Sequence, residues 1–209
     1  MESPLCRADT RLIETFGWTG TAFRRLDAHL ARARASATAL GFVWNRPAIG
    51  AALRGVSGES PLRVRLTIGK SGDIEVTTAP LAPNPPEWRV RVAAERLDPD
   101  APLLRHKTTE REMYDRARAA LPAGIDEILY LNMRDEVAEG TISNVFADFG
   151  DSMLVTPPLA SGCLPGILRA ELLGAGKARE GLLTGADLTR AQLYLGNSLR
   201  GLIPARIVD

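Results

Sequence analysis

The 209-residue sequence has few of the residues from which metal sites and disulfide frameworks are built. Its two cysteines, Cys6 and Cys163, and its two histidines, His29 and His106, are not spaced as metal ligands usually are. No segment approaches the roughly 20 apolar residues that a membrane-spanning helix needs. The N-terminus also lacks the apolar core of a signal peptide. We therefore expect a cytoplasmic protein without a metal site.

A strong charge of one sign is also absent. The 26 basic and 25 acidic residues leave a formal net charge of +1, which provides no field to concentrate nucleic acid or an anionic membrane. Lysine is scarce, since Lys70, Lys107 and Lys177 are the only ones, so few amines are candidates for covalent chemistry. The hydrophobic fraction of 45% is typical of a globular protein of one domain or two small ones.

Hydrophobic periodicity in the first half predicts an α+β domain. In order, we expect a strand at 12–18 that turns back at 22–24, a helix at 26–40 ended by Gly41, a helix at 47–56, an antiparallel pair at 62–68 and 74–78, and a strand at 88–94. A proline-rich connector at 80–86 precedes the last of these strands.

The second half predicts an α/β domain. We expect a helix at 108–121, a strand at 127–132, a turn at 133–136 with two short strands, a helix at 165–173 and a strand at 192–195. The acidic, proline-containing segment 97–104 is the expected link, which gives an N-terminal domain at 1–98 and a C-terminal domain at 99–209. The fold class is therefore α+β / α/β in two small domains.

Lys107 lies where an extended segment is expected to meet a helix capped by Thr108 or Thr109, with Glu112 as the reciprocal partner. A lysine amine attacks an aldehyde only when it is uncharged, so burial or neighbouring positive charge, from His106 or arginines, must lower its pKa. The alternative is an exposed lysine without chemistry.

Two later segments carry further candidates. Glu139, in EVAEGTISNVF, could hold a protonated pyridine nitrogen, and its alternative is a solvated turn glutamate. Gly162, Pro165 and Gly166 precede a helix whose first N–H groups, at 167 and 168, could bind a phosphate. Many loops of this composition only turn the chain.

Two weaker candidates complete this set. Arg32, one turn beyond His29 on the first long helix, could donate two hydrogen bonds to a phosphate, or it could be a surface arginine. The segment Gly196-Asn197-Ser198 could add a hydroxyl to the same anion, or it could be an ordinary turn.

Taken in order, these segments resemble the fold-type IV pyridoxal-phosphate family, which includes branched-chain and D-amino-acid aminotransferases and aminodeoxychorismate lyases. The resemblance runs from Leu12 to Arg206. LIET at 12–15 resembles the family's FET strand, RLDAHLAR at 25–32 its LxxHxxRL helix, and RHKTTEREMY at 105–114 its K(T/Y)xxRxxY segment. Only eleven residues precede Leu12, fewer than the family usually has.

The resemblance implies pyridoxal 5′-phosphate as cofactor between the two domains, an amino-acid-like small-molecule substrate, and a homodimer. It implies that Lys107 forms the Schiff base and moves the substrate proton, while Glu139 is the partner of the pyridine nitrogen. The other cofactor-binding residues that it implies are Tyr114 at the ring hydroxyl, Arg32, Ser198 and the N–H groups of Ile167 and Leu168 at the phosphate, and Asn144 in support of these contacts.

Within the family, Thr15 after Glu14 and the segment GNSL at 196–199 favour a lyase, with Thr15 as a candidate catalytic residue and Arg200 as a ligand of a substrate carboxylate. The expected reaction is the release of pyruvate from 4-amino-4-deoxychorismate to form 4-aminobenzoate. A class IV aminotransferase acting on branched-chain or D-amino acids stays open. So does a cofactor-free binding or regulatory module on the same scaffold.

Overall fold

The computed structural model describes residues 5–208, which form two compact units. Among these residues, unit 1 comprises 5–83 and 106–110, and unit 2 comprises 84–105 and 111–208. The chain therefore passes from unit 1 to unit 2 after Pro83, which is earlier than the boundary predicted after residue 98. The reason is strand β4 (Trp88–Val92), which pairs in parallel with two strands of unit 2.

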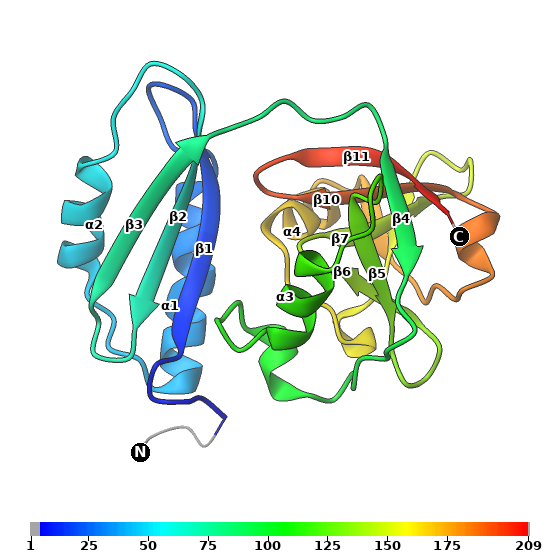
Figure 1. The fold of residues 1–209 in the computed structure, drawn as a ribbon, viewed down its shortest axis with the longest axis horizontal. Coiled ribbons are helices and arrows are strands. Elements are labelled where there is room, and N and C mark those ends of the chain that lie inside the picture. Colours follow the sequence, from blue (N-terminus) through cyan, green and yellow to red (C-terminus); the bar gives the residue numbers. More distant parts are fainter. Residues whose placement is uncertain (1–4, 209) are drawn as a thin grey trace. The chain divides into compact units, whose positions relative to one another are not determined.

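Unit 1 is an antiparallel sheet of β1 (Arg11–Trp18), β2 (Leu62–Gly69) and β3 (Ile74–Pro80), in that order. Helix α1 (Leu26–Leu40) packs on β1, and α2 (Arg46–Arg54) contacts β3 (Figure 1). All five elements were predicted from the sequence. The expected return strand at 22–24 is only a single bridge between Trp18 and Phe23.

Helix α1 follows the sequence pattern closely. Its buried stripe includes Leu30, Ala33, Ala37 and Leu40, which recur at the three- and four-residue steps of one helix face. Gly41 ends the helix with a φ of 72°, a left-handed conformation that glycine adopts without a steric penalty. The predicted position of the helix end is confirmed.

Unit 2 is built around a closed sheet. Its strands are β4, β5 (Glu127–Leu131), β6 (Val137–Gly140), β7 (Asn144–Asp148), β8 (Leu154–Thr156), β9 (Ala178–Glu180), β10 (Gln192–Asn197) and β11 (Gly201–Ile207). They are ordered β10-β11-β4-β5-β6-β7-β8-β9, and an additional pairing of β10 with β7 closes the first six into a barrel. The helices of this unit are α3 (Glu112–Ala119) and α4 (Ile167–Gly174), with short 3₁₀ turns at Pro102–Arg105, Leu159–Ser161 and Asp187–Thr189.

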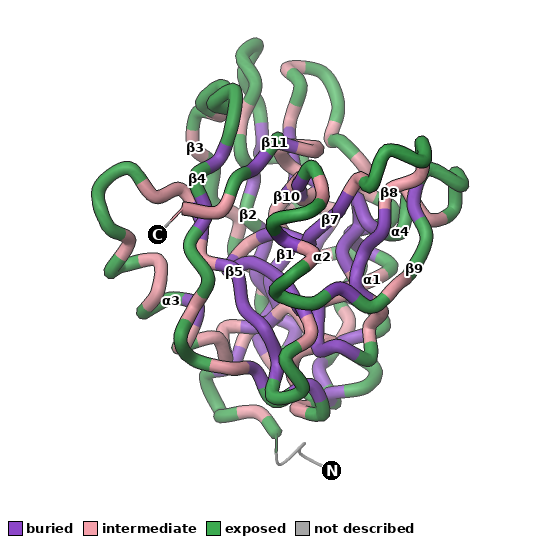
Figure 2. The backbone as a smooth tube through the Cα atoms, turned by 90° about the vertical axis from the view of Figure 1, so that its right-hand side faces the viewer, coloured by how far each residue is buried: buried purple, intermediate pink, exposed green. Residues whose placement is uncertain are grey.

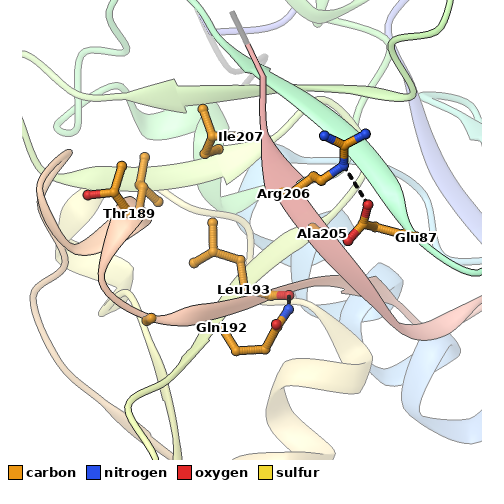
Figure 3. A pocket seen from close by; sticks show the side chains of 9 residues that line it. Glu87, Thr189, Gln192, Leu193, Ala205, Arg206 and Ile207 are labelled. Atoms are coloured by element: carbon orange, nitrogen blue, oxygen red, sulfur yellow. Dashed lines mark hydrogen bonds and ion pairs between the residues drawn. The ribbon is translucent and has the colours of Figure 1, made fainter.

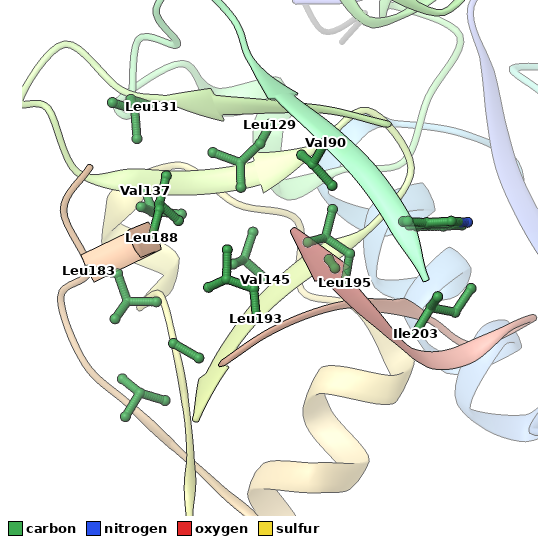
Figure 4. Close-up of a cluster of buried hydrophobic side chains, with 14 residues drawn as sticks. Val90, Leu129, Leu131, Val137, Val145, Leu183, Leu188, Leu193, Leu195 and Ile203 are labelled. Carbon is green, nitrogen blue, oxygen red and sulfur yellow. The ribbon is translucent and has the colours of Figure 1, made fainter. Parts of the chain in front are cut away.

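The barrel encloses an apolar core. Alternate residues of each strand point inward, so that Leu129, Val145 and Leu195, all without exposed surface, meet in the interior (Figure 4). Strands β5 and β7 are buried along almost their whole length (Figure 2). Residues on the outer face of such strands are therefore held on a rigid support.

The start of α3 differs from the prediction. The helix begins at Glu112, its N-cap is Arg111, and no side chain caps it. Thr108 and Thr109 instead lie in a segment that hydrogen-bonds to β1, where the Thr109 hydroxyl accepts the backbone N–H of Arg11 at 3.0 Å. The predicted capping box is therefore wrong. Thr108 and Thr109 form hydrogen bonds with β1, so they are extended and lie too far before the helix start to cap it.

No helix among residues 5–208 combines the length and the apolar character needed to cross a membrane.

Candidate active site

Lys107 lies on a short extended segment at the free edge of β1. Its carbonyl accepts the backbone N–H of Ile13 at 2.8 Å, the N–H of Thr109 donates to Arg11 at 2.9 Å, and Leu12 and Thr108 form an antiparallel bridge between them. This segment therefore adds to the sheet as an antiparallel neighbour of β1. Its register is fixed by backbone hydrogen bonds rather than by a helix cap.

Side-chain alternation assigns Lys107 to one face of this sheet. Leu12 and Glu14 lie on the α1 face, and so does His106, which contacts Ser36 of α1 at 3.0 Å. Lys107, one residue on, is directed to the opposite face, which it shares with Thr15. The structure thus brings two predicted catalytic residues to one face of unit 1.

The α1 face carries the other predicted residue of unit 1, Arg32. Its Nε donates to Glu14 Oε1 at 2.9 Å and its Nη2 to Glu14 Oε2 at 2.6 Å, while His29 Nδ1 lies 2.5 Å from the same Oε2. Glu14 is 2% exposed. One edge of the Arg32 guanidinium, formed by Nε and Nη2, is therefore held by a bidentate ion pair, which orients the side chain.

The pKa values of Glu14 and His106 depart from their ordinary range. Burial alone would raise the pKa of Glu14, but the adjacent Arg32 and the hydrogen bond with His29 outweigh it and lower the pKa. Burial lowers the pKa of His106, so this histidine is neutral near pH 7. The expectation that His106 contributes positive charge beside Lys107 is therefore wrong.

A bulge in β6 directs Glu139 outward from the barrel of unit 2. Tyr130 of β5 pairs with Glu139, but the next residue, Leu131, pairs with Val137, so Ala138 is an extra residue in β6. Val137 lies in the barrel core, whereas Ala138 packs outside it with Tyr130. The bulge therefore places a carboxylate on the outer face where regular alternation would turn it toward the apolar core.

Two hydrogen bonds within unit 2 hold Glu139. The Tyr114 hydroxyl of α3 donates to its Oε1 at 2.8 Å, and the Leu164 backbone N–H donates to its Oε2 at 2.9 Å. Burial, then the nearby carboxylate, raises the pKa of Tyr114, so the hydroxyl stays protonated. The Tyr114 hydroxyl thus donates its proton to Glu139 in this structure. The predicted hydrogen bond from Tyr114 to the ring hydroxyl of the cofactor stays untested.

Asn144 lies next to Glu139, with which it pairs across β6 and β7. Its Nδ2 donates to the Leu164 carbonyl at 3.0 Å, so these two side chains bind both backbone groups of Leu164. A Cβ on Gly166 would lie 1.8 Å from Asn144 Oδ1, so a side chain at this N-cap would displace the Asn144 amide. Asn144 therefore supports the start of α4, and its predicted support of cofactor contacts stays untested.

The start of α4 presents open donors. Among residues 5–208, the backbone N–H groups of Ile167 and Leu168 have no hydrogen-bond acceptor, as expected for a first helical turn. Gly196 of β10 pairs with Asn144, and a Cβ on it would lie 2.9 Å from Leu168 Cδ2. The predicted phosphate-binding segments are thus neighbours on the outer face of the barrel.

The turn after β10 is organised by Asn197. Its Oδ1 accepts the backbone N–H groups of Leu199 at 3.1 Å and Arg200 at 3.0 Å, and Ser198 between them is 6% exposed. Arg200 Nη1 donates to Asn84 Oδ1 at 3.0 Å, and Asn84 Nδ2 donates to the Arg200 carbonyl. Arg200 is therefore engaged with Asn84, and its predicted contact with a substrate stays untested.

Sequence reasoning missed Arg65. It pairs directly with Thr15 across β1 and β2, so both side chains lie on the Lys107 face, and Arg63 follows on the same face. The signal was present in the alternating sequence LRVRLTI, in which two arginines are spaced by two residues. The sequence alone predicts only a strand here, because the face on which the two arginines lie depends on how this strand pairs with β1.

A hollow elsewhere in unit 2 contains none of the predicted site residues. Its volume is about 270 Å³, and it lies at the end of the β10–β11 hairpin remote from Ser198 (Figure 3). Glu87 and Arg206, joined by an ion pair of 2.6 Å, form one side of it. The predicted chemistry is therefore not associated with this hollow.

Two observations concern the cysteine and metal-ligating side chains of the described residues. Burial raises the pKa of Cys163 to about 12, so its thiol is unreactive at neutral pH. No group of three or more His, Cys, Asp or Glu side chains among residues 5–208 is arranged to hold a metal ion.

The family model described as amino-transferase class IV matches residues 11–208. The chain belongs to this family. A relative in Schizosaccharomyces pombe, provisionally named an aminodeoxychorismate lyase, is 33% identical over 204 residues, which cover 92% of this chain and 87% of the relative. The aminodeoxychorismate lyase of Saccharomyces cerevisiae is 28% identical over 192 residues, which cover 69% of this chain and 51% of that protein. The chain thus spans about half the length of the latter.

A solved structure from Mesorhizobium loti, provisionally named an amino-acid aminotransferase, is 46% identical, with a TM-score of 0.89 over 96% of this chain and 100% of that chain. The family resemblance and the fold class expected from the sequence are confirmed. Relatives carry both lyase and aminotransferase names, so the choice between these reactions depends on the site.

Proposed function

We propose that this class IV aminotransferase family member is a pyridoxal-phosphate enzyme that releases pyruvate from 4-amino-4-deoxychorismate and forms 4-aminobenzoate. The observation that carries the proposal is the outward, buried Glu139, fixed by Tyr114 and by the backbone of Leu164. The lyase names of the Schizosaccharomyces pombe and Saccharomyces cerevisiae relatives support this reaction over others in the family.

The residues present fit pyridoxal phosphate. The N–H groups of Ile167 and Leu168 are open at a helix start, and Gly196 leaves the adjacent space free of a side chain. In our proposal these groups, with Ser198 and Arg32, hold the phosphate. Glu139 is the partner of the ring nitrogen, and Lys107 supplies the amine.

When bound, the cofactor supplies an aldehyde for amines and a ring that accepts an electron pair from the substrate. Glu139 keeps a proton on the ring nitrogen, which requires that the carboxylate remain ionised. The Lys107 amine removes the proton from the carbon that bears the substrate's amino group. In the lyase reaction the C–O bond at the neighbouring carbon would then break, and its electron pair would leave with the enolate of pyruvate, which takes up a proton to become pyruvate.

Substrate binding would use the face of unit 1 that carries Lys107. The proposed substrate has two carboxylates, which require cationic or hydrogen-bonding partners. Arg65 and Arg63 lie on this face, and Thr15 stands directly beside Arg65 in the register. We propose these side chains as carboxylate ligands, in addition to Arg200.

A second candidate is transamination, which the Mesorhizobium loti structure favours because it is 46% identical and provisionally named an amino-acid aminotransferase. In that reaction Lys107 would return the proton to the cofactor, and no C–O bond would break. Pyruvate release from 4-amino-4-deoxychorismate, measured against amino transfer from branched-chain or D-amino acids, separates the two. We also propose that the protein is a homodimer. Analytical sedimentation of the same sample measures its oligomeric state.

The test of cofactor binding is the visible spectrum of the protein with pyridoxal phosphate, before and after borohydride, followed by mass mapping. We expect an absorption band that borohydride abolishes and an added mass on the peptide that contains Lys107. Labelling of Lys70 or Lys177 instead, or no band at all, would contradict the proposal. Those outcomes would favour a cofactor-free binding module on this scaffold.

A further inference from the structure

The three-residue turn Thr141–Ser143 joins β6 to β7 and therefore stands between Glu139 and Asn144. The N–H of Gly140 donates to the Ser143 carbonyl at 2.8 Å and closes the turn. A Cβ on Gly140 would lie 2.5 Å from the Ser143 hydroxyl and 3.0 Å from the Glu127 carboxylate, so a side chain here would displace these groups. Any displacement of this turn would move both side chains that bind Leu164.

The carboxylate of Glu127, at the start of β5, holds this turn. Its Oε1 accepts the Thr141 N–H at 3.1 Å and the Thr141 hydroxyl, while its Oε2 accepts the Ile142 N–H at 3.2 Å and the Ser143 hydroxyl at 2.9 Å. Glu127 has no exposed surface. If the carboxylate were lost, these buried donors would lack their acceptor, so the turn would rearrange.

Other parts of unit 2 are attached to the same turn. Asn197 Nδ2 donates to the Ile142 carbonyl at 3.1 Å, and Asn197 also organises the turn that contains Ser198. Arg111 Nη2 donates to the Thr141 carbonyl at 2.8 Å, immediately before the helix whose Tyr114 contacts Glu139. The turn is therefore a common anchor for three segments that carry proposed cofactor ligands.

We propose that Glu127 is a positioning residue, which fixes Glu139, Asn144 and Ser198 relative to one another by holding the Thr141–Ser143 turn. It acts through β6, β7 and Asn197 and has no proposed contact with the cofactor or substrate. The claim that these residues meet a cofactor rests on the proposed function. The claim that Glu127 controls the contact between Glu139 and Leu164 does not.

The first experiment measures amide hydrogen exchange in the cofactor-free protein. Leu164 is the reporter, because its N–H donates to Glu139 and makes no contact with Glu127. In Glu127→Gln we expect its protection to fall roughly tenfold, since one acceptor oxygen becomes a donor and the turn loosens. Wild-type protection of Leu164 in this variant would overturn the proposal.

Asp187→Asn is the matched control. Asp187 Oδ2 also accepts a backbone N–H and a hydroxyl, both from Thr184 at 2.8 Å, in another turn of unit 2. We expect this variant to lose the Thr184 contacts without a change in Leu164 protection. An equal loss at Leu164 would mean that the effect is general destabilisation, which also overturns the proposal.

The second experiment uses the protein loaded with pyridoxal phosphate. We expect Glu127→Gln to weaken cofactor binding and to lower kcat, each roughly tenfold or more, with KM changed by less than about threefold. Because Glu127 acts through Glu139, adding Glu127→Gln to Glu139→Gln should lower kcat little further. Additive losses, or an unchanged dissociation constant, would contradict the positioning role.

Ser143→Ala provides the same test if Glu127→Gln does not fold. It removes one hydroxyl donor to Glu127. We expect Leu164 protection, cofactor affinity and kcat to fall as in Glu127→Gln, but by less. If none of the three falls, the proposal is overturned. If wild-type protein fails to bind the cofactor at Lys107, the proposed function fails, while the Leu164 exchange still tests the positioning. If it binds normally and the variants match it, only the positioning proposal fails.

Discussion

The two units of this protein each bury a carboxylate of the candidate site, but its hydrogen-bond donors differ. In unit 1, Glu14 accepts two hydrogen bonds from the Arg32 guanidinium and contacts His29. In unit 2, a tyrosine hydroxyl and a backbone N–H donate to Glu139. The guanidinium in unit 1 compensates the charge of Glu14, whereas the tyrosine hydroxyl and the backbone N–H in unit 2 are neutral donors that orient the Glu139 carboxylate. We infer that Glu14 is chiefly structural and Glu139 chiefly chemical.

The largest effect is expected at Lys107, on which the proposed chemistry of both units depends. Lys107→Ala should abolish turnover, because neither Glu14 nor Glu139 can replace an amine that bonds the cofactor and moves the proton. The fold should persist, since the backbone contact of this residue with Ile13 is retained. Pyruvate release and circular dichroism test both parts.

Lys177→Ala is the control for this experiment, because Lys177 is an exposed lysine in unit 2. We expect wild-type rates from it. A Lys107→Ala protein with near wild-type rates would show that the amine has no catalytic role.

A smaller but still large effect is expected for Glu139→Gln. An amide cannot stabilise a protonated ring nitrogen, so kcat should fall by roughly 10²- to 10³-fold, a range typical of the loss of one electrostatic group in an active site. Steady-state kinetics with saturating cofactor provide the measurement. The matched control is Glu87→Gln, which breaks the surface pair with Arg206 and should leave kcat unchanged. An unaltered kcat in Glu139→Gln would make this residue structural, like Glu14.

Features set by local sequence were predictable in both units. Helix α1 follows from its periodic apolar residues and Gly41, and the three strands of unit 1 follow from their alternation. Glu139 was a candidate from its own segment and Asn144 from the family resemblance, and their roles stay predictions. These signals do not depend on which strand pairs with which.

Features set by strand pairing were not predictable. The bulge at Ala138, which turns Glu139 outward, is visible only once β6 is aligned with β5. The hydrogen bond from Tyr114 to Glu139 joins residues 25 apart, and the assignment of β4 to unit 2 depends on strands far along the chain. Arg65 was missed for the same reason, since its face is defined by its partner Thr15.

The charge compensation in unit 1 predicts a large cost for Glu14→Gln. Removing one partner leaves the Arg32 guanidinium, which is 12% exposed, without its counter-charge. Breaking a buried pair in this way typically costs about 3 kcal/mol of the free energy of unfolding. Chemical denaturation measures the loss. A change below about 0.5 kcal/mol, as for a surface pair, would refute the structural role.

The same pair makes unit 1 sensitive to acid. The pKa of Glu14 is lower in the folded protein than its ordinary value of 4.5, so the folded state binds this proton less readily than the unfolded state. The stabilisation is therefore complete above about pH 4.5 and is lost as the pH falls through the folded pKa. The difference in unfolding free energy between wild type and Glu14→Gln should shrink below pH 4.5. A difference independent of pH would show that charge is not involved.

The smallest effect is expected where unit 2 relies on a neutral donor. Tyr114→Phe removes the hydroxyl that donates to Glu139 but keeps the ring, which packs edge-to-face against Tyr130 with 5.5 Å between centroids. Loss of one hydrogen bond to a carboxylate typically costs about 1.5 kcal/mol, which corresponds to roughly tenfold in kcat if the bond orients Glu139 during the reaction. Tyr130→Phe, which alters the other ring of the pair, is the control. If both variants lowered kcat equally, aromatic packing rather than the neutral donor would hold Glu139, and the contrast with Glu14 would lose its basis.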